Sequence, residues 1–222
     1  MKELVKEIAK ESIKEITKQN AEQMTKEKLY ELKQQIQNFI PFNEQEECDK
    51  AILLKWFKSG MDILTRENEI AHLTASAWVV SPDRKSVLMA YHNIYHSWAW
   101  LGGHADGDAD LHQVARKEVM EESGVTHVKF LSDEPFSIEI LSVDGHVKKG
   151  RYVATHLHLN VTYLMEADPA DAVQNRPEEN SAVAWIPVEQ IAEKSTEPWF
   201  VEHVYAKLCE KVERRKDRQR IR

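Results

Sequence analysis

The feature that most constrains the fold is a segment near the middle of the chain, residues 102–125, which reads GGHADGDADLHQVARKEVMEESGV. Its second half, Asp110 to Ser123, contains no glycine or proline, and a glycine follows it directly. Both properties predict a helix that ends at this glycine. At about 100° per residue, Glu118, Glu121 and Glu122 then lie on one face of that helix.

Three carboxylates on one helix face repel one another, and each close pair destabilises a helix by a few tenths of a kcal/mol. A bound cation is the simplest compensation, and oxygen ligands favour Mg²⁺ or Mn²⁺ over zinc. A solvated acidic face is the ordinary alternative. Ala115 and Val119, four residues apart, form an apolar stripe beside the acids, so this helix can dock on a core.

Apolar runs rich in valine, threonine and tryptophan predict β-strands on both sides of the helix. The strands are predicted at residues 73–80, 86–91, 97–101, 128–141, 151–166 and 183–186, and helices at 188–194 and 199–215. Pro135 is expected to interrupt the fourth strand, and Asp144-Gly145 to form the turn before the fifth. This mixed order predicts one domain of the α/β or α+β class over residues 66–222.

Residues 1–65 are predicted to be a helical N-terminal extension. The first forty residues contain many Lys, Glu and Gln and no glycine or proline, with apolar residues at helical spacing from Leu29 to Phe39. A further helix is predicted at 44–59, where Gly60 ends it. Amphipathic helices of this kind can serve as packing arms or as the contact of a homodimer.

Composition excludes several other classes of protein. No run approaches the roughly 20 apolar residues of a membrane-spanning helix. The two cysteines, Cys48 and Cys209, are far apart, which is typical of a reducing, cytoplasmic setting. A net charge of -7 makes nucleic acid an unlikely general partner. The basic tail from Lys207 to Arg222 is expected to be a solvated helix end, with contact to RNA or polyphosphate as the alternative.

The segment at 102–125 resembles the Nudix box of the Nudix hydrolase family. In that motif a glycine is followed after five residues by a glutamate and, after seven more, by Arg-Glu. The motif ends with an aliphatic residue, any residue, Glu-Glu, any residue, glycine and a second aliphatic residue. Gly103 opens the motif in this chain, and the stretch from Glu118 to Val125 matches it in register.

Two positions depart from the family pattern. Ala109 stands where the family has its first glutamate, and Lys117 where it has arginine. Lysine keeps the charge of the arginine that orients a catalytic glutamate, but it lacks the planar fork. Asp106, Asp108 and Asp110 lie close to the missing carboxylate, although none of them is in register with it.

The resemblance implies a Nudix-like α/β/α sandwich with a mixed β-sheet and a metal-assisted attack of water on a diphosphate. It implies Glu121 and Glu122 as metal ligands, and Glu118 as a ligand or as the base that activates water. The backbone carbonyl of Gly103 is a further implied ligand, and Lys117 is included in the catalytic group.

Members of the family often recruit one more carboxylate from a loop outside the box. Glu178 and Glu179, just before the last predicted strand, are the candidates, with an exposed acidic turn as the alternative. Trp98 and Trp100 would share a face of a strand, as in a base-stacking platform. Packing of at least one of them in the core is the preferred interpretation.

Three histidines are further candidates for contact with the substrate. His104 follows the Gly-Gly pair and can touch phosphate. His156 and His158 share a face of a predicted strand, which suggests either a zinc site or the lining of the substrate cleft. Zinc ranks second, because no cysteine partner or second paired cluster accompanies them.

These features predict an enzyme that hydrolyses a phosphoanhydride bond in a nucleoside diphosphate derivative or a modified nucleoside triphosphate. The main alternative is a catalytically weak Nudix-fold protein that binds a nucleotide and regulates, for which Ala109 and Lys117 are the best support. An isomerase of isoprenoid diphosphates is remote, since neither cysteine lies near the predicted cleft. The motif leaves open the substrate, the general base and the oligomeric state.

Overall fold

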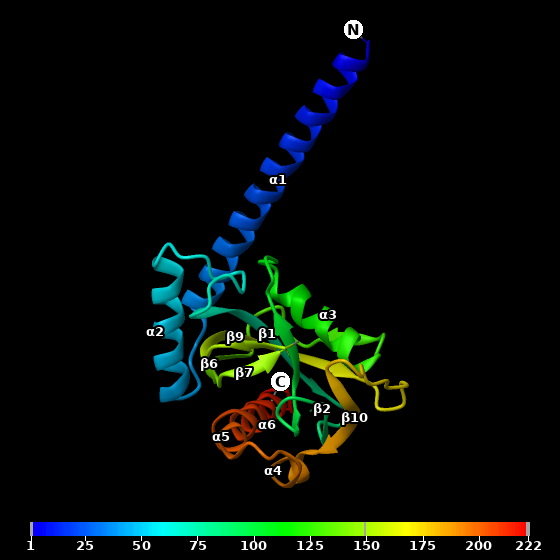
Figure 1. Ribbon diagram of the computed structural model, residues 1–222. Helices are drawn as coiled ribbons and strands as arrows, with labels where there is room; N and C mark the ends of the chain where they lie inside the picture. Colours follow the sequence, from blue (N-terminus) through cyan, green and yellow to red (C-terminus); the bar gives the residue numbers. More distant parts are fainter. Residues whose placement is uncertain (1, 149, 221–222) are drawn as a thin grey trace.

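The computed structural model describes residues 2–148 and 150–220, with the backbone alone at residues 2–6, 8, 9, 12, 13 and 216–220. Residues 221–222, which end the predicted basic tail, lie outside the described residues. The helical elements are α1 (Lys2–Asn38), α2 (Glu44–Lys58), α3 (Leu111–Ser123), η1 (Val188–Gln190), α4 (Ile191–Lys194), α5 (Pro198–Phe200), η2 (Val201–Tyr205) and α6 (Ala206–Arg220) (Figure 1). The strands are β1 (Ala71–Val80), β2 (Ser86–His92), β3 (Ser97–Ala99), β4 (Leu101–His104), β5 (Val128–Phe130), β6 (Ser137–Val143), β7 (His146–Lys148), β8 (Arg151–Val153), β9 (His156–Ala167) and β10 (Asn180–Pro187).

Eight of the strands form one mixed β-sheet. Its order is β10-β2-β1-β9-β5, and β3, β4 and β6 pair with β2, β1 and β9, respectively. The central strands β1 and β9 run parallel, whereas the other pairs in the sheet are antiparallel. Strands β7 and β8 form a separate hairpin.

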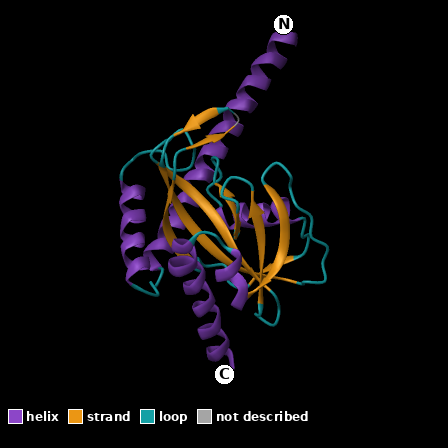
Figure 2. Cartoon of the chain, turned by 60° about the horizontal axis from the view of Figure 1, so that its bottom comes forward, coloured by secondary structure: helices purple, strands orange, loops and turns teal. Residues whose placement is uncertain are grey.

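Helices cover both faces of this sheet, so every residue of β1 is buried. Side chains alternate between the two faces of a strand. The odd-numbered residues of β1, such as Ala75, share a core cluster with Val119 of α3 and Leu53 of α2. Trp78, an even-numbered residue, belongs to a second cluster with Leu208 of α6. The sheet therefore lies between α3 on one side and α5–α6 on the other, which confirms the predicted sandwich (Figures 1 and 2).

Helix α3 has the bounds that the sequence predicts to within one residue. The Asp110 carboxylate accepts a hydrogen bond from the backbone N–H of Gln113 at 3.2 Å and so caps the N-terminus. Gly124 adopts a left-handed conformation, with φ of 72°, and its N–H donates to the carbonyl of Met120. A residue with a side chain is strained in this conformation, which explains why a glycine ends the helix.

Two of the predicted strands differ from the structure. The strand predicted at 97–101 is two strands, because residues 97–99 pair with β2 whereas residues 101–104 pair with β1. The region predicted at 151–166 is also divided, into β8 and β9, and β8 closes the small hairpin with β7. Pro135 lies between β5 and β6, as expected for a residue that interrupts strand pairing.

The helical extension packs onto the sheet only at its C-terminal end. Leu32 and Ile36 of α1 and Leu53 of α2 are buried in the same cluster as the sheet residues. The earlier part of α1 projects away from the body of the protein, where Ile16 and Met24 are exposed (Figure 1). None of the helices in the described part of the chain has the length and apolar character needed to cross a membrane.

Candidate active site

The three predicted metal-binding glutamates lie on the side of α3 that faces strand β4. Glu122 is 8% exposed, and its carboxylate accepts a hydrogen bond from the backbone N–H of Gly102 at 2.9 Å. Glu118 lies against Gly103 so closely that a Cβ atom there would be 2.5 Å from the carboxyl carbon. Only glycine leaves room for this approach of backbone and carboxylate. Glu121 is the outermost of the three, with 40% of its side chain exposed.

The site is electrostatically strained without a cation. Burial, followed by the charges of Glu121 and Glu179, raises the pKa of Glu118 to about 6. Burial is also the main cause that raises the pKa of Glu122 to about 8, against the opposing effect of the hydrogen bond from Gly102. Buried carboxylates with raised pKa values lose their mutual repulsion when a divalent cation binds. The donor set, carboxylate oxygens beside a glycine backbone, suits Mg²⁺ or Mn²⁺.

A guanidinium group from another part of the chain joins these carboxylates. The Nη1 atom of Arg176, in the loop between β9 and β10, lies 3.1 Å from Glu121 and 3.4 Å from Glu179. Lys117, predicted to replace the family arginine, is 67% exposed and lies 3.8 Å from Glu121. The charges of Lys117 and Arg176 both lower the pKa of Glu118, against the larger effect of burial. Sequence reasoning missed Arg176, since a single arginine in a loop has no periodic signal.

The same loop is fixed to α3 by a buried asparagine. The side chain of Asn180 donates to the carbonyl of Glu122 at 3.0 Å and accepts from the backbone N–H of Arg176 at 3.1 Å. This anchor places Glu179 where its charge contributes to raising the pKa of Glu118 and of Glu122. Glu178 is exposed, so the structure separates the two glutamates that the sequence offered as a pair.

The aspartates before α3 are occupied elsewhere, and Ala109 is 5% exposed within the core. Asp106 makes two hydrogen bonds to Arg66, at 2.7 and 2.6 Å. Asp108 accepts from the backbone N–H of Asp110, which is itself the helix cap. None of the three aspartates therefore substitutes for the glutamate that the family has at position 109.

The two tryptophans lie on the α6 side of the sheet. Trp98 and Trp100 are partly buried against the cluster that contains Trp78. Trp98 packs edge-on against Tyr91, with ring centroids 5.7 Å apart, and Trp100 packs against Tyr205 at 5.9 Å. Both thus contribute to core packing.

The predicted histidines gather on the α6 side as well, separated by the sheet from α3. The ring of His104 lies 4.9 Å from that of His158, and His158 lies 5.1 Å from His156. His72 of β1, which sequence reasoning did not single out, completes the group at 5.0 Å from His156.

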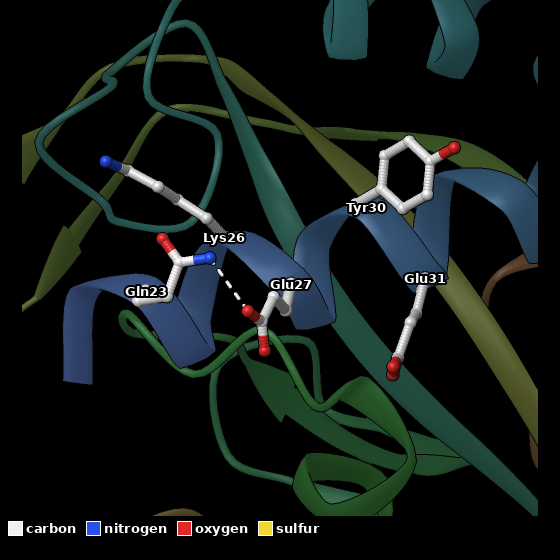
Figure 3. A pocket seen from close by; sticks show the side chains of 5 residues that line it. All are labelled: Gln23, Lys26, Glu27, Tyr30 and Glu31. Carbon is white, nitrogen blue, oxygen red and sulfur yellow. Dashed lines mark hydrogen bonds between the residues drawn. The ribbon is translucent and has the colours of Figure 1, made fainter. Parts of the chain in front are cut away.

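Two surface depressions lie away from the glutamates. One follows α1 and is lined by Gln23, Lys26, Glu27, Tyr30 and Glu31 (Figure 3). The other lies between α1 and the start of α3, next to Ala109 and Tyr163. Neither is lined by Glu118, Glu121 or Glu122, so the candidate site is defined by its charged groups and not by either depression.

Comparison with known proteins places the chain in a family. The sequence profile of the NUDIX domain matches residues 71–208, which is more than half of the chain. The protein therefore belongs to the Nudix family. No curated protein matches the sequence significantly.

Solved structures that resemble this chain include several Nudix proteins. An Ap4A hydrolase of C. elegans, in a binary complex, is 20% identical over 64% of this chain and 95% of its own, with a TM-score of 0.46. A NUDIX-family hydrolase of Clostridium perfringens is 16% identical, covering 62% and 95%, with a TM-score of 0.45. The NUDIX domain of Shewanella oneidensis NrtR, complexed with ADP ribose, is 18% identical, covering 64% and 86%, with a TM-score of 0.44.

Proposed function

We propose that this protein is a divalent-metal-dependent pyrophosphohydrolase. Its substrate would be a nucleoside diphosphate derivative or a modified nucleoside triphosphate, cleaved at a phosphoanhydride bond. The observation that carries the proposal is the pair of carboxylates, buried Glu122 and partly buried Glu118, held against Gly102 and Gly103 within a Nudix domain. In an enzyme of this class the cation neutralises charge on the diphosphate and makes a bound water more acidic.

The residues of the chain have distinct proposed roles. Glu118, Glu121 and Glu122 would hold Mg²⁺ or Mn²⁺ together with the carbonyl of Gly103. The alternative role proposed for Glu118 is that of the base that activates water, in place of a metal ligand. Glu122 is fixed by the N–H of Gly102, so its carboxylate keeps one orientation.

Arg176 is the proposed positioning residue. Its guanidinium contacts Glu121 and Glu179 together and so fixes two carboxylates from separate elements relative to each other. The exposed ammonium of Lys117, by contrast, contacts Glu121 alone, at 3.8 Å. Glu179 is the proposed additional carboxylate from outside the motif, and Glu178 has no role in the proposal.

A regulatory protein that binds a nucleotide without hydrolysing it is the second candidate. The observation in its favour is the burial of Ala109, because no carboxylate can act from that position. The intact glutamates of α3 favour hydrolysis instead.

The test is hydrolysis of a panel of compounds that contain a phosphoanhydride bond, followed by chromatography of the phosphate esters or pyrophosphate that cleavage produces. The panel includes nucleotide sugars, dinucleoside polyphosphates, ADP-ribose, coenzyme A, and canonical and oxidised nucleoside triphosphates, each with Mg²⁺, Mn²⁺ or a chelator. The variant Glu122→Gln is compared with Glu189→Gln, which changes an exposed glutamate on η1. Metal-dependent turnover lost only in Glu122→Gln would support the enzyme. Ligand-induced stabilisation without turnover in either metal would favour the regulatory protein.

A further inference from the structure

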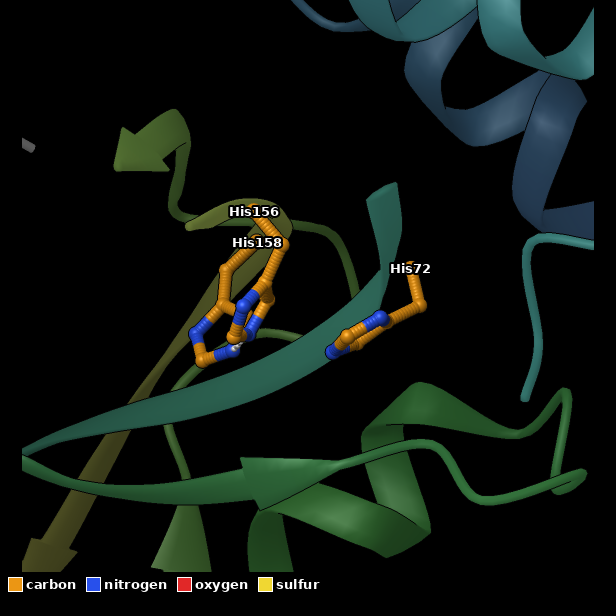
Figure 4. A group of neighbouring side chains, drawn as sticks. All are labelled: His72, His156 and His158. Carbon is orange, nitrogen blue, oxygen red and sulfur yellow. Dashed lines mark hydrogen bonds between the residues drawn. The ribbon is translucent and has the colours of Figure 1, made fainter. Parts of the chain in front are cut away.

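Three histidines from two neighbouring strands meet on the face of the sheet opposite α3. His72 of β1 and His158 of β9 are direct partners in the parallel register, and His156 lies two residues before His158 on the same face. The ligand nitrogens of all three lie within 4.8 Å of one another (Figure 4). Among the side chains that the structure describes, this is the one group of three potential metal ligands so closely placed.

In two of the three rings, a hydrogen bond to the backbone leaves the lone pair on the ε nitrogen. The Nδ1 atom of His72 lies 3.0 Å from the carbonyl oxygen of Asn68, and that of His156 lies 2.8 Å from the carbonyl oxygen of Ala154. A carbonyl oxygen only accepts, so in both rings the proton is on Nδ1 and the lone pair is on Nε2. This is the usual arrangement of a metal-binding histidine, whose second nitrogen is held by a carbonyl or carboxylate.

The Nε2 atom of His72 has a buried position that requires an explanation. His72 is 4% exposed, and its Nε2 is buried without any hydrogen-bond partner among the described residues. A buried polar atom without a partner is unfavourable, and such atoms often mark the site of an ion or water. His156 and His158 lie next to this atom.

One of the distances in this group is that expected between two ligands of tetrahedral zinc. The Nε2 atoms of His156 and His158 are 3.3 Å apart. Two nitrogens bound to tetrahedral zinc at about 2.0–2.1 Å are separated by roughly 3.3–3.4 Å. Without a metal, the same distance is a hydrogen bond in which one ring must carry its proton on Nε2. The Nε2 atom of His72 must move closer to complete the coordination.

The donor set of this group consists of imidazole nitrogens alone. Imidazole nitrogens without a carboxylate favour zinc and similar transition metals over Mg²⁺.

We propose that His72, His156 and His158 bind a Zn²⁺ ion, with His104 beside the fourth coordination position. The site would be separate from the carboxylates of α3, because the sheet lies between them. A metal bound there joins β1 to β9, the parallel pair at the centre of the sheet, and binding to the folded state alone would stabilise the protein.

The test is zinc titration of the full chain after treatment with a chelator. Calorimetry is expected to show that one Zn²⁺ binds, both in excess Mg²⁺ and in its absence. Zinc binding is also expected to raise the melting temperature. Co²⁺ in its place should give the visible absorption of a tetrahedral nitrogen site. Glu122→Gln should bind zinc as the parent does, which distinguishes this site from the carboxylates.

Histidine variants identify the ligands. His72→Gln and His158→Gln should each weaken zinc binding by about 100-fold. His203→Gln, at an exposed histidine on η2, should leave binding unchanged and is the matched control. His158 is less buried than His72, so His158→Gln decides the question if His72→Gln does not fold. The proposal is overturned if the parent binds no zinc, if folded His158→Gln binds it normally, or if Glu122→Gln loses it.

Discussion

Replacing Glu122 by glutamine should abolish hydrolysis and, without metal, stabilise the protein at alkaline pH. Glu122 is 8% exposed, and burial raises its pKa to about 8. The folded state therefore binds this proton more tightly than the unfolded chain, whose glutamate has a pKa of 4.5. The stability that the proton contributes is complete below pH 4.5 and is lost as the pH rises to about 8.

The size of the effect follows from the two pKa values. A tenfold change in proton affinity is worth about 1.4 kcal/mol, so full ionisation of Glu122 costs at most about 5 kcal/mol. Relaxation of the site and entry of water reduce this to about 2–5 kcal/mol. Glutamine has the same shape, its oxygen can still accept from the N–H of Gly102, and it carries no charge. At about 2–4 °C per kcal/mol for a chain of this size, its melting temperature should exceed that of the parent by roughly 5 °C or more at pH 8.5.

The assay is thermal denaturation of the parent and Glu122→Gln in the presence of a chelator, at pH 5.5 and 8.5. The difference should be small at pH 5.5 and large at pH 8.5, and Glu189→Gln should follow the parent at both. Mg²⁺ should stabilise the parent but not Glu122→Gln. An equal difference at both pH values would refute the argument from burial, and normal turnover by Glu122→Gln would refute its catalytic role.

Three further predictions concern the backbone of β4, the guanidinium and a buried ion pair. Gly103→Ala should fold normally but lose about 10- to 100-fold in kcat, because its methyl group displaces only the flexible end of a glutamate. Gly102→Ala should instead lower the free energy of unfolding by about 1–3 kcal/mol in a denaturant titration, since its methyl group meets backbone atoms. Arg176→Ala should reduce kcat by about tenfold or more, whereas Lys117→Ala should leave kcat nearly unchanged, because Lys117 contacts Glu121 alone. Both variants should shift the acidic limb of the pH–rate profile upward, since both charges lower the pKa of Glu118. Lys207→Met should cost about 3–5 kcal/mol in the same titration, because it removes the amine that lies 3.0 and 3.5 Å from two buried carboxylates.

Helix α3 could be predicted from the sequence because its signals are local. Asp110 caps backbone groups within three residues of itself, and Gly124 supplies the left-handed conformation directly after the last turn. The common face of Glu118 and Glu122 follows from the helical period alone. Knowledge of the rest of the chain was not needed for either inference.

Strand boundaries were harder to predict because they depend on the partner strand. Local sequence gives no sign that the chain changes partner at Trp100, since no turn residue separates the two segments. The division between β8 and β9 has the same origin, as only the second of them pairs with β1. Strand formation is determined more by tertiary pairing than by local propensity.

The sequence analysis missed two side chains, Arg176 and His72. Both lie outside the helix and the strands whose patterns were recognised. Arg176 reaches α3 because Asn180 ties their loop to the helix, and no periodic pattern reports that contact. His72 joins His158 because β1 and β9 pair in parallel with these two residues opposite each other. His72 is far from His156 and His158 in the sequence, so only the strand register reveals that a third histidine lies beside them.

The two departures from the Nudix motif differ in their physical consequences. Lys117 keeps a positive charge near Glu121, and Arg176 supplies from another element the planar guanidinium that lysine lacks. Ala109 has no such replacement, because it is buried in the core and the neighbouring aspartates are occupied as caps and ion-pair partners. Any carboxylate that completes the site must therefore come from beyond the motif. Glu179 is the candidate that already lies within electrostatic reach of Glu118.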